Sequence, residues 1–381
     1  MADRSDLSWI SSERARRAKS AVAVAVSFFI ILGSLGFVSW KGYGLYMDWR
    51  QKDDYIGDGD DPIQIIIEPG VGWGRVGDIL AAHEVVQDAR LFTTEALKLS
   101  AGPETAGTYN LRTHLPAETA ALMLNDTKNL VVLRTTIPEG RMLSEVLPVL
   151  SESLQISMDD LNKALEDVKA DPSIIGLNPA AGNNPEGFLF PDTYLLHPPY
   201  ETTPVKVFSR MATEFNNVAA SLDLEAKAQS VGLNMQQAVV IASIIEEEVN
   251  RAEYRPMVAR TLLNRINIDM PLGVESAFRY GRLVTDGIPY GDQITRSSMN
   301  DASLPYNYYA NPGLPLAPIA GPGREALRAA VNPADGDWLY WVTVNLNTGE
   351  TKFTASSAEF EVFAAEFREW CAANGNPTGC S

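Results

Sequence analysis

The sequence of 381 residues has few of the side chains on which metal sites and disulfide frameworks depend. Its three histidines, His83, His114 and His197, form no HxxxH or HExxH pattern, so we expect no metal site and no cofactor. Its two cysteines, Cys371 and Cys380, match no metal-binding spacing. An oxidising compartment would permit a disulfide between them, and two free thiols are the alternative.

Positive charge is also scarce. The chain has 31 Lys and Arg against 48 Asp and Glu, a formal net charge of -17. Such a surface repels phosphate backbones, which excludes nucleic acid as a partner. The hydrophobic share of 45% is large enough for a buried core and excludes a wholly disordered chain.

Charge is absent altogether from the twenty-one residues Ser20 to Trp40. As a helix they would extend about 31 Å, enough to span a bilayer. We therefore expect a cytoplasmic tail over 1–19, a single transmembrane helix over 20–40 and a polar spacer over 41–61. Five basic residues precede the helix and three soon follow it, which favours an extracytoplasmic body. A buried globular helix and a cleavable signal peptide are the alternatives.

The remainder of the chain predicts an α+β body with two units, 62–154 and 155–381. A strand, a break and an apolar helical stripe occur twice, beginning at 63–67 and at 130–137, although two copies are also compatible with coincidence. Further helices are expected over 89–99, 117–125, 158–170, 203–222, 234–249 and 358–373, with a shorter one that follows 203–222 and ends at Ser230. A strand is expected near 108–111, and a hairpin over 338–345 and 351–354.

One carboxylate stands out at the end of an apolar helix. Residues 238–245 (AVVIASII) are apolar except Ser243, and Glu246 follows on the same face as Ala242. Partial burial, the adjacent glutamates and the helix C-terminus would each raise its pKa, as a general acid requires. A solvated helix end rich in glutamate is the alternative.

The stretch IASIIEEE, together with VARTLLNRINIDMPL, YNYYANPGLPLAPIAGPG and FLFPDTY, resembles the endolytic murein transglycosylases of the YceG-like family. The resemblance implies a membrane helix, a small LysM-like module with a linking βα unit in 62–154, and a catalytic domain in 155–381. It also places the catalytic acid at Glu246. It implies that Tyr194, Tyr306, Asn307 and Tyr308 face the sugar, although these residues could instead fix their loops.

The resemblance implies a lyase of the bacterial cell membrane, with peptidoglycan glycan strands as substrate and peptidoglycan synthases as neighbours. Glu246 would protonate the β-1,4 glycosidic oxygen between N-acetylmuramic acid and N-acetylglucosamine. It would then deprotonate the C6 hydroxyl of the same muramoyl unit, closing a 1,6-anhydro ring that ends the strand. An intramolecular nucleophile explains why one carboxylate suffices, whereas hydrolysis usually needs two.

Several positions depart from the family pattern. After Leu272 the family shows a pattern like LQxDxTVxY, whereas this chain has GVESAF at 273–278 and keeps only the acid, at Glu275, and the aromatic, at Tyr280. Phe360 replaces a histidine after Glu359. Two other functions therefore stay open. One is a non-catalytic scaffold that binds the cell wall, and the other is a hydrolytic muramidase that uses Glu246 with Glu186 or Glu275. Asp192 is expected to cap a turn, and Asn264 with Arg265 to pin a helix end.

Overall fold

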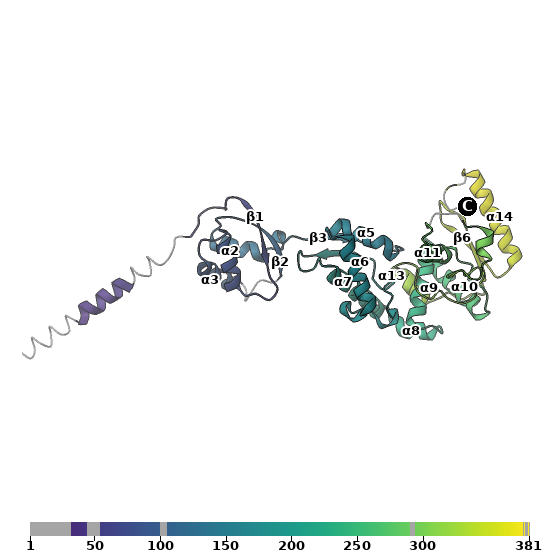
Figure 1. The fold of residues 1–381 in the computed structure, drawn as a ribbon, viewed down its shortest axis with the longest axis horizontal. Coiled ribbons are helices and arrows are strands. Elements are labelled where there is room, and N and C mark those ends of the chain that lie inside the picture. The colour runs from purple at the N-terminus through teal and green to yellow at the C-terminus, as the bar shows by residue number, and fades with distance from the viewer. Residues whose placement is uncertain are drawn as a thin grey trace, which may run out of the picture. The chain divides into compact units, whose positions relative to one another are not determined.

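The computed structural model describes residues 32–43, 54–99, 105–289, 294–375, 377 and 380. The chain divides into two compact units between Leu130 and Val131 (Figure 1). Each unit has its own hydrophobic core. The three sheets of the described residues are two-stranded and antiparallel, and helices make up most of the rest, which agrees with the expected mixture of α and β structure.

The first unit has the element order βααβα. Its elements are β1 (Pro62–Ile67), α2 (Trp73–Ala82), α3 (Ala89–Leu99), β2 (Gly107–Arg112) and α4 (Ala117–Asn125). Strand β1 pairs with β2 so that Ile65 lies opposite Tyr109. Alternate side chains of β1 point inward, and Ile65 and Ile67 are buried with Trp73 and Phe92, whose rings meet edge to face. Helices α2 and α3, which carry these two rings, thus cover one face of the small sheet formed by β1 and β2.

The second unit begins with a short sheet and a set of helices. Strand β3 (Leu133–Thr136) pairs with β4 (Thr193–Leu196), with Leu133 opposite Leu196. The helices are α5 (Leu143–Leu154), α6 (Met158–Ala170), α7 (Pro204–Leu222), α8 (Leu224–Ser230), α9 (Met235–Glu248), α10 (Arg255–Asn267), α11 (Glu275–Asp286), α12 (Arg296–Met299) and α13 (Arg324–Ala330). Most of them pack around one continuous apolar core.

Helix α9 lies at the centre of this core. Asn234 caps it as predicted, because its side-chain oxygen accepts a hydrogen bond from the Gln237 N–H while the Asn234 N–H donates to the side-chain oxygen of Gln237. All eight residues of 238–245 are buried, none more than 2% exposed. Helices α8, α10, α11 and α13 surround α9. This burial explains why the segment is apolar on every face.

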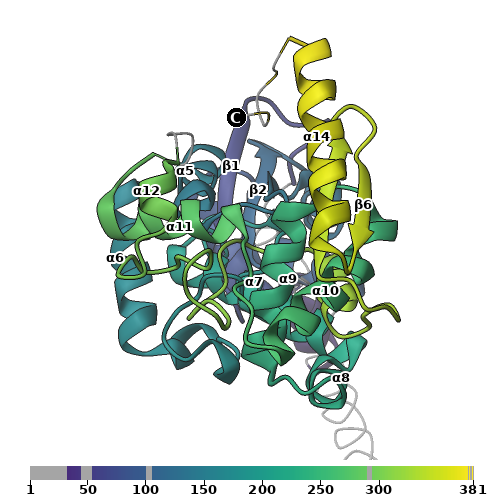
Figure 2. The same cartoon turned by 90° about the vertical axis from the view of Figure 1, so that its right-hand side faces the viewer.

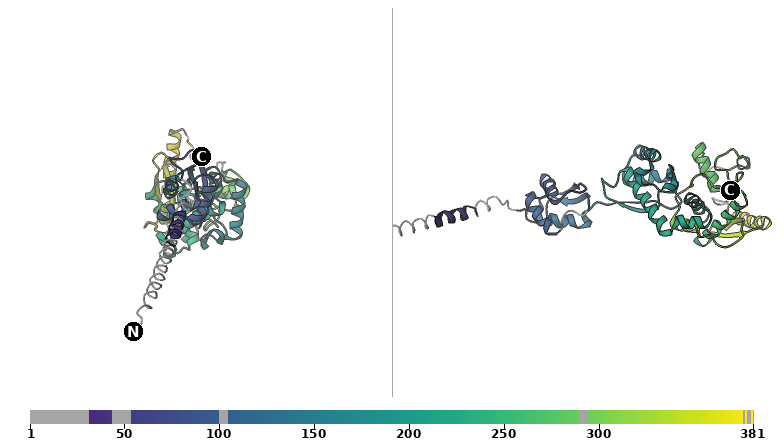
Figure 3. Two further views of the ribbon diagram at one scale, coloured as in Figure 1. Left: turned by 90° about the vertical axis from the view of Figure 1, so that its left-hand side faces the viewer. Right: turned by 90° about the horizontal axis from the view of Figure 1, so that it is seen from below.

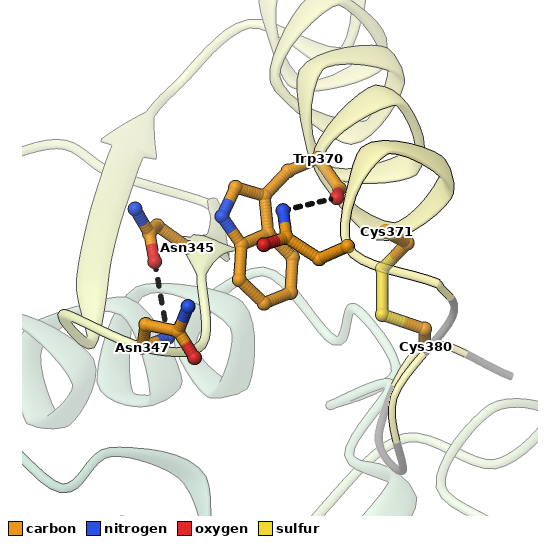
Figure 4. Close-up of a disulfide and its surroundings, with 6 residues drawn as sticks. Asn345, Asn347, Trp370, Cys371 and Cys380 are labelled. Atoms are coloured by element: carbon orange, nitrogen blue, oxygen red, sulfur yellow. Dashed lines mark hydrogen bonds between the residues drawn. A yellow bond between two sulfur atoms is a disulfide. The ribbon is translucent and has the colours of Figure 1, made fainter.

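The chain ends in a hairpin and a long helix. Strands β5 (Tyr340–Asn345) and β6 (Glu350–Thr354) pair antiparallel, and α14 (Ser357–Ala373) lies alongside them (Figure 2). At the end of α14, Cys371 forms a disulfide with Cys380 next to Trp370 (Figure 4). The disulfide decides between the two alternatives that the sequence left open for these cysteines.

Two boundaries differ from those expected. The strand expected over 130–137 spans only Leu133–Thr136. Leu130 is not part of it and forms an isolated bridge with Tyr109 of the first unit. Strand β3 and helix α5, which we grouped with 62–154 as a linking βα unit, belong to the second compact unit, because β3 pairs with β4. The second copy of the strand-break-helix pattern therefore contributes to the larger unit.

The predicted membrane segment is described only in part. Residues 1–31 and 44–53, which hold the predicted tail, the first part of the segment and much of the spacer, lie outside the described residues. Residues 32–43 form an exposed helix, dark purple in Figure 3. No helix within the described ranges meets the length and apolarity needed to cross a membrane.

Candidate active site

Glu246 occupies the last turn of α9, where the buried segment ends. Its side chain is only 7% exposed. The next residue, Glu247, is exposed, because consecutive residues on a helix point about 100° apart. The helix therefore turns the Glu246 carboxyl inward, as its position relative to Ala242 predicted.

Two donors from other segments hold this carboxyl. Arg255, in the first turn of α10, donates from Nη2 to Oε1 of Glu246 at 2.6 Å. The backbone N–H of Gly323, just before α13, donates to Oε2 at 2.9 Å. The Arg255 side chain is itself 11% exposed, so this is an ion pair largely removed from water. Such a pair fixes the orientation of the carboxyl.

A turn from the start of the second unit borders the same carboxyl. Gly140 donates from its N–H to the Gly321 carbonyl, and Gly321 donates back to the Arg141 carbonyl, each at 2.9 Å. Gly140 has a φ of 76°, and a Cβ there would lie 3.0 Å from Oε1 of Glu247 and 3.7 Å from Cγ of Glu246. The tight turn and the close approach both favour glycine.

The serine of the apolar helix ties α9 to the same loop. Ser243 donates from Oγ to the Val240 carbonyl at 2.8 Å and accepts a hydrogen bond from the Ile319 N–H at 3.1 Å. Both partners are buried. The single polar residue of 238–245 therefore satisfies a backbone N–H of the 318–323 loop, four residues before the glycine that holds Glu246.

Burial raises the pKa of Glu246. The Gly323 N–H and the Arg255 cation lower the pKa of Glu246, while the negative charge of Glu139 raises it further. The direction agrees with the sequence prediction, although the charged neighbours differ from those expected. A carboxyl with a raised pKa, held by one cation and one N–H, can donate a proton and then remain stable as a carboxylate.

The family model described as the YceG-like family matches residues 65–366. The chain belongs to the YceG-like family. The match covers both compact units and confirms the resemblance seen in the motifs. It includes the loop 318–323, the helix that ends at Glu246 and the turn at Gly140, so the site lies wholly within the family region.

Curated relatives cover most of the chain at low identity. The endolytic murein transglycosylase of Bacillus subtilis (strain 168) is 24% identical over 314 residues, which are 79% of this chain and 84% of the relative. The endolytic murein transglycosylase of Streptococcus pneumoniae serotype 2 is 23% identical over 371 residues, 90% of this chain and 65% of the relative. The crystal structure of a YceG-like protein from Listeria monocytogenes has a TM-score of 0.51 at 23% identity, covering 80% of this chain and 99% of that one, and supports the fold.

Glu186, considered as a second carboxylate of the cleft, is deeply buried. Its two carboxyl oxygens accept from the Leu143 N–H, the first of α5, at 2.9 and 3.2 Å, and the Tyr280 hydroxyl stands 3.5 Å from Oε2. Burial raises the pKa of Glu186 to about 8, even though the Leu143 N–H lowers it. The raised pKa favours the protonated form of this carboxyl at neutral pH, where it accepts from the first N–H of α5.

The atypical segment 273–278 forms the start of α11 and makes its own contacts. Ser276 donates from Oγ to Oε1 of Glu248 at 2.8 Å, and burial raises the pKa of Glu248. Glu275 is partly exposed and accepts from Arg279 at 2.6 Å. Glu248, the third glutamate of the cluster, is thus held by Ser276, which departs from the family pattern.

The residues predicted to face the sugar in the 306–308 loop lie close together but are mostly buried. The Asn307 amide donates to the carbonyls of Ser298, Met299 and Asp301 and accepts from the Tyr309 N–H. Tyr308 donates to the Leu314 carbonyl at 2.9 Å, and burial raises its pKa to about 12. Both side chains hold the loop together. Tyr306 is half-buried, with its ring 5.3 Å from that of Tyr280.

Tyr194 lies on β4, apart from the 306–308 loop in the sequence, and is 5% exposed. Its hydroxyl donates to the Phe190 carbonyl at 2.6 Å, so its polar atom is used within the protein. Asp192 accepts from the Thr193 N–H at 2.6 Å, the local turn bond that we expected. A sugar contact by Tyr194 stays a prediction.

The Asn264 and Arg265 pair anchors α10 to the strand region that follows α13. Asn264 donates to the carbonyls of Gly336 and Trp338, and Arg265 donates to those of Leu339 and Leu272. The Arg265 guanidinium also lies over the rings of Tyr340 and Trp341, at 5.3 and 5.2 Å from their centres. These contacts pin the end of α10, and its expected place on the wall of the cleft stays a prediction.

Sequence reasoning missed the three partners of Glu246, which are Arg255, Gly323 and Glu139. Arg255 follows the acid in the sequence as an ordinary basic residue at the start of a helix. Gly323 belongs to the loop motif YNYYANPGLPLAPIAGPG without standing out in it, and Glu139 lies in the break after the 130–137 strand, where no pattern marks it. The only signal near Glu139 is the Pro and Gly break itself, which follows a strand in both copies of the strand-break-helix pattern.

Proposed function

We propose that this chain is a membrane-anchored lytic transglycosylase that cleaves nascent peptidoglycan strands at the β-1,4 bond between N-acetylmuramic acid and N-acetylglucosamine. The observation that carries the proposal is the buried Glu246 carboxyl, held by Arg255 and the Gly323 N–H with its pKa raised. Membership of the YceG-like family supports it, as does the name endolytic murein transglycosylase carried by the curated relatives.

In the proposed reaction, protonated Glu246 gives its proton to the glycosidic oxygen as the bond to C1 of the muramoyl unit breaks. The N-acetylglucosamine side leaves as an alcohol. Arg255 stabilises the Glu246 carboxylate that results. This carboxylate then takes the proton of the C6 hydroxyl as that oxygen bonds to C1. The 1,6-anhydro ring closes, Glu246 regains its proton and no water is consumed.

Membrane anchoring through residues 20–40, with the body outside the cytoplasm, is part of the proposal. The uncharged segment and the basic tail before it support this placement. The Cys371–Cys380 disulfide also supports it, because disulfides persist in oxidising compartments. We further propose that 62–130 is a LysM-like glycan-binding module, on the basis of its βααβ order and its paired β1 and β2.

The hydrolytic alternative has little support at the residues that it needs. Hydrolysis with retention or inversion needs a second carboxylate that is ionised and within reach of the sugar. Glu186 is buried and its raised pKa of about 8 favours the neutral form at neutral pH, so it lacks the charge that this role requires. An intramolecular C6 hydroxyl needs no second carboxylate.

The decisive experiment is mass spectrometry of the products released from purified glycan strands by the full-length chain. Transglycosylation gives anhydromuramoyl ends, which are lighter by one water than the reducing ends left by hydrolysis. Glu246→Gln should abolish release, while the control Glu253→Gln, which changes an exposed carboxylate paired with Arg251, should keep it. Reducing ends from the wild type would favour a muramidase. Binding to peptidoglycan without any cleavage by the wild type would favour a scaffold.

A further inference from the structure

A second carboxylate reaches the site on the turn that carries Gly140. Residues 140 and 141 exchange backbone hydrogen bonds with Gly321, so the turn is fixed against the 321–323 segment. Glu139, the residue before Gly140, is exposed. Its carboxyl lies over Gly323, since a Cβ added to that glycine would be 2.0 Å from the Cδ of Glu139.

Gly323 therefore lies between two carboxyl groups. Its N–H donates to Glu246 at 2.9 Å, while the Glu139 carboxyl occupies the space where a side chain would otherwise project. Any other residue at position 323 would collide with Glu139 or force it away. The glycine thus allows a negatively charged group to approach the acid from a segment that is distant in the sequence.

We infer that Glu139 is a positioning residue that favours the protonated form of Glu246 and so keeps it ready to act as the general acid. The inference rests on the proposed function, because it assigns a role within that reaction. Glu139 acts through its charge, across Gly323, and the proton itself stays on Glu246.

The charged groups that face Glu246 from other segments are Glu139 on the turn and Arg255 on α10, and they oppose each other. Arg255 favours the carboxylate and Glu139 favours the acid. Glu247, on the same helix, points toward Gly140 from the exposed side. A group that must first give and then take a proton needs both forms to be accessible, and the two opposing charges provide this balance.

The test is the pH dependence of cleavage by the full-length chain carrying Glu139→Gln. Loss of the negative charge should lower the pKa of Glu246, so that the alkaline limb of the kcat/KM profile moves to lower pH by roughly half a unit, the effect of one exposed charge. Activity on the acid side of the profile should stay near that of the wild type. Glu139→Asp keeps the charge and should shift the limb less.

Glu325→Gln is the control for net charge, since it removes an exposed carboxylate paired with Arg328 on α13 and should leave the limb in place. An unshifted limb in Glu139→Gln would overturn the inference. So would an equal loss of activity at every pH, because that result indicates a direct substrate contact or a structural role. If Glu139→Gln does not fold, Gly323→Ala serves in its place. The added methyl group displaces the Glu139 carboxyl and should also move the alkaline limb to lower pH.

A measurement that needs no cleavage separates this inference from the proposed function. Carboxyl NMR of the full-length chain labelled at glutamate, with Glu246→Gln to assign the signal, follows the titration of Glu246 directly. The midpoint should fall in Glu139→Gln whether or not glycan is the substrate. A wild type that never cleaves glycan would refute the proposed function, and an unchanged midpoint would refute the role of Glu139.

Discussion

Replacing Glu186 by glutamine should raise the free energy of unfolding of the second unit above that of the wild type at alkaline pH. At acidic pH this advantage over the wild type should be small. In the unfolded chain this carboxyl ionises near its ordinary pKa of 4.5, whereas in the folded chain it keeps its proton up to about pH 8. Between these values the unfolded state releases a proton that the folded state holds. The free energy of unfolding of the wild type therefore falls as pH rises.

The magnitude follows from the difference between the two pKa values. One pKa unit corresponds to about 1.4 kcal/mol, so the contribution of Glu186 to the free energy of unfolding falls by about 3 to 4 kcal/mol between pH 5 and pH 8. Glutamine has no ionisation and lacks this loss. Its amide oxygen can still accept from the Leu143 N–H, so the cap of α5 is kept.

Urea unfolding of the full-length chain at pH 5 and pH 8, followed by tryptophan fluorescence, measures the effect. The transition of the second unit reports through Trp338, Trp341 and Trp370, and that of the first unit through Trp73. Glu166→Gln, at an exposed residue paired with Lys169, is the control and should parallel the wild type. If the free energies of unfolding of Glu186→Gln and the wild type differ by the same amount at pH 5 and pH 8, the reasoning from a buried ionisable group is refuted.

Three further changes test the contacts around the site and the C-terminus. Ser243→Ala should lower the free energy of unfolding by about 1 to 3 kcal/mol in urea titration, because it leaves the buried Ile319 N–H unpaired. Arg255→Gln should move the alkaline limb of the pH profile to higher pH, opposite to Glu139→Gln, since the cation lowers the pKa of Glu246; an acid shift would contradict this. Cys380→Ser should raise hydrogen exchange at the end of α14 and leave cleavage unchanged, because the disulfide closes only a local loop of nine positions.

Local signals in the sequence were sufficient for the helix that carries the acid. Asn234 followed by Gln237 is a capping pattern, and the eight buried positions 238–245, followed directly by Glu246, indicated both the helix and the partial burial of the carboxyl. These features depend on residues within one helix, where periodicity determines which side chains share a face. The direction of the Glu246 pKa shift followed from them.

The partners of the acid could not be predicted in this way. Gly323 is 77 residues from Glu246, and Glu139 comes from a turn at the start of the unit. No periodic pattern links such segments, because their approach depends on how the helices pack. Strand β4 was also missed, since its four residues, next to Pro191, are too few to show alternation. For Asn307 and Tyr308 the sequence left open whether they face the sugar or fix the loop, and their hydrogen bonds hold that loop together.

The long separation between Glu246 and Gly323 has a consequence for the synthesis of the chain. A growing chain that has passed α9 but has not reached Gly323 carries the acid without the N–H that orients it, and without the segment that fixes the turn at Gly140. Domains fold as units from the N-terminus during translation, so this site forms late. The set of contacts that orients the Glu246 carboxyl is therefore complete only after residue 323 has been made and the second unit has folded around it.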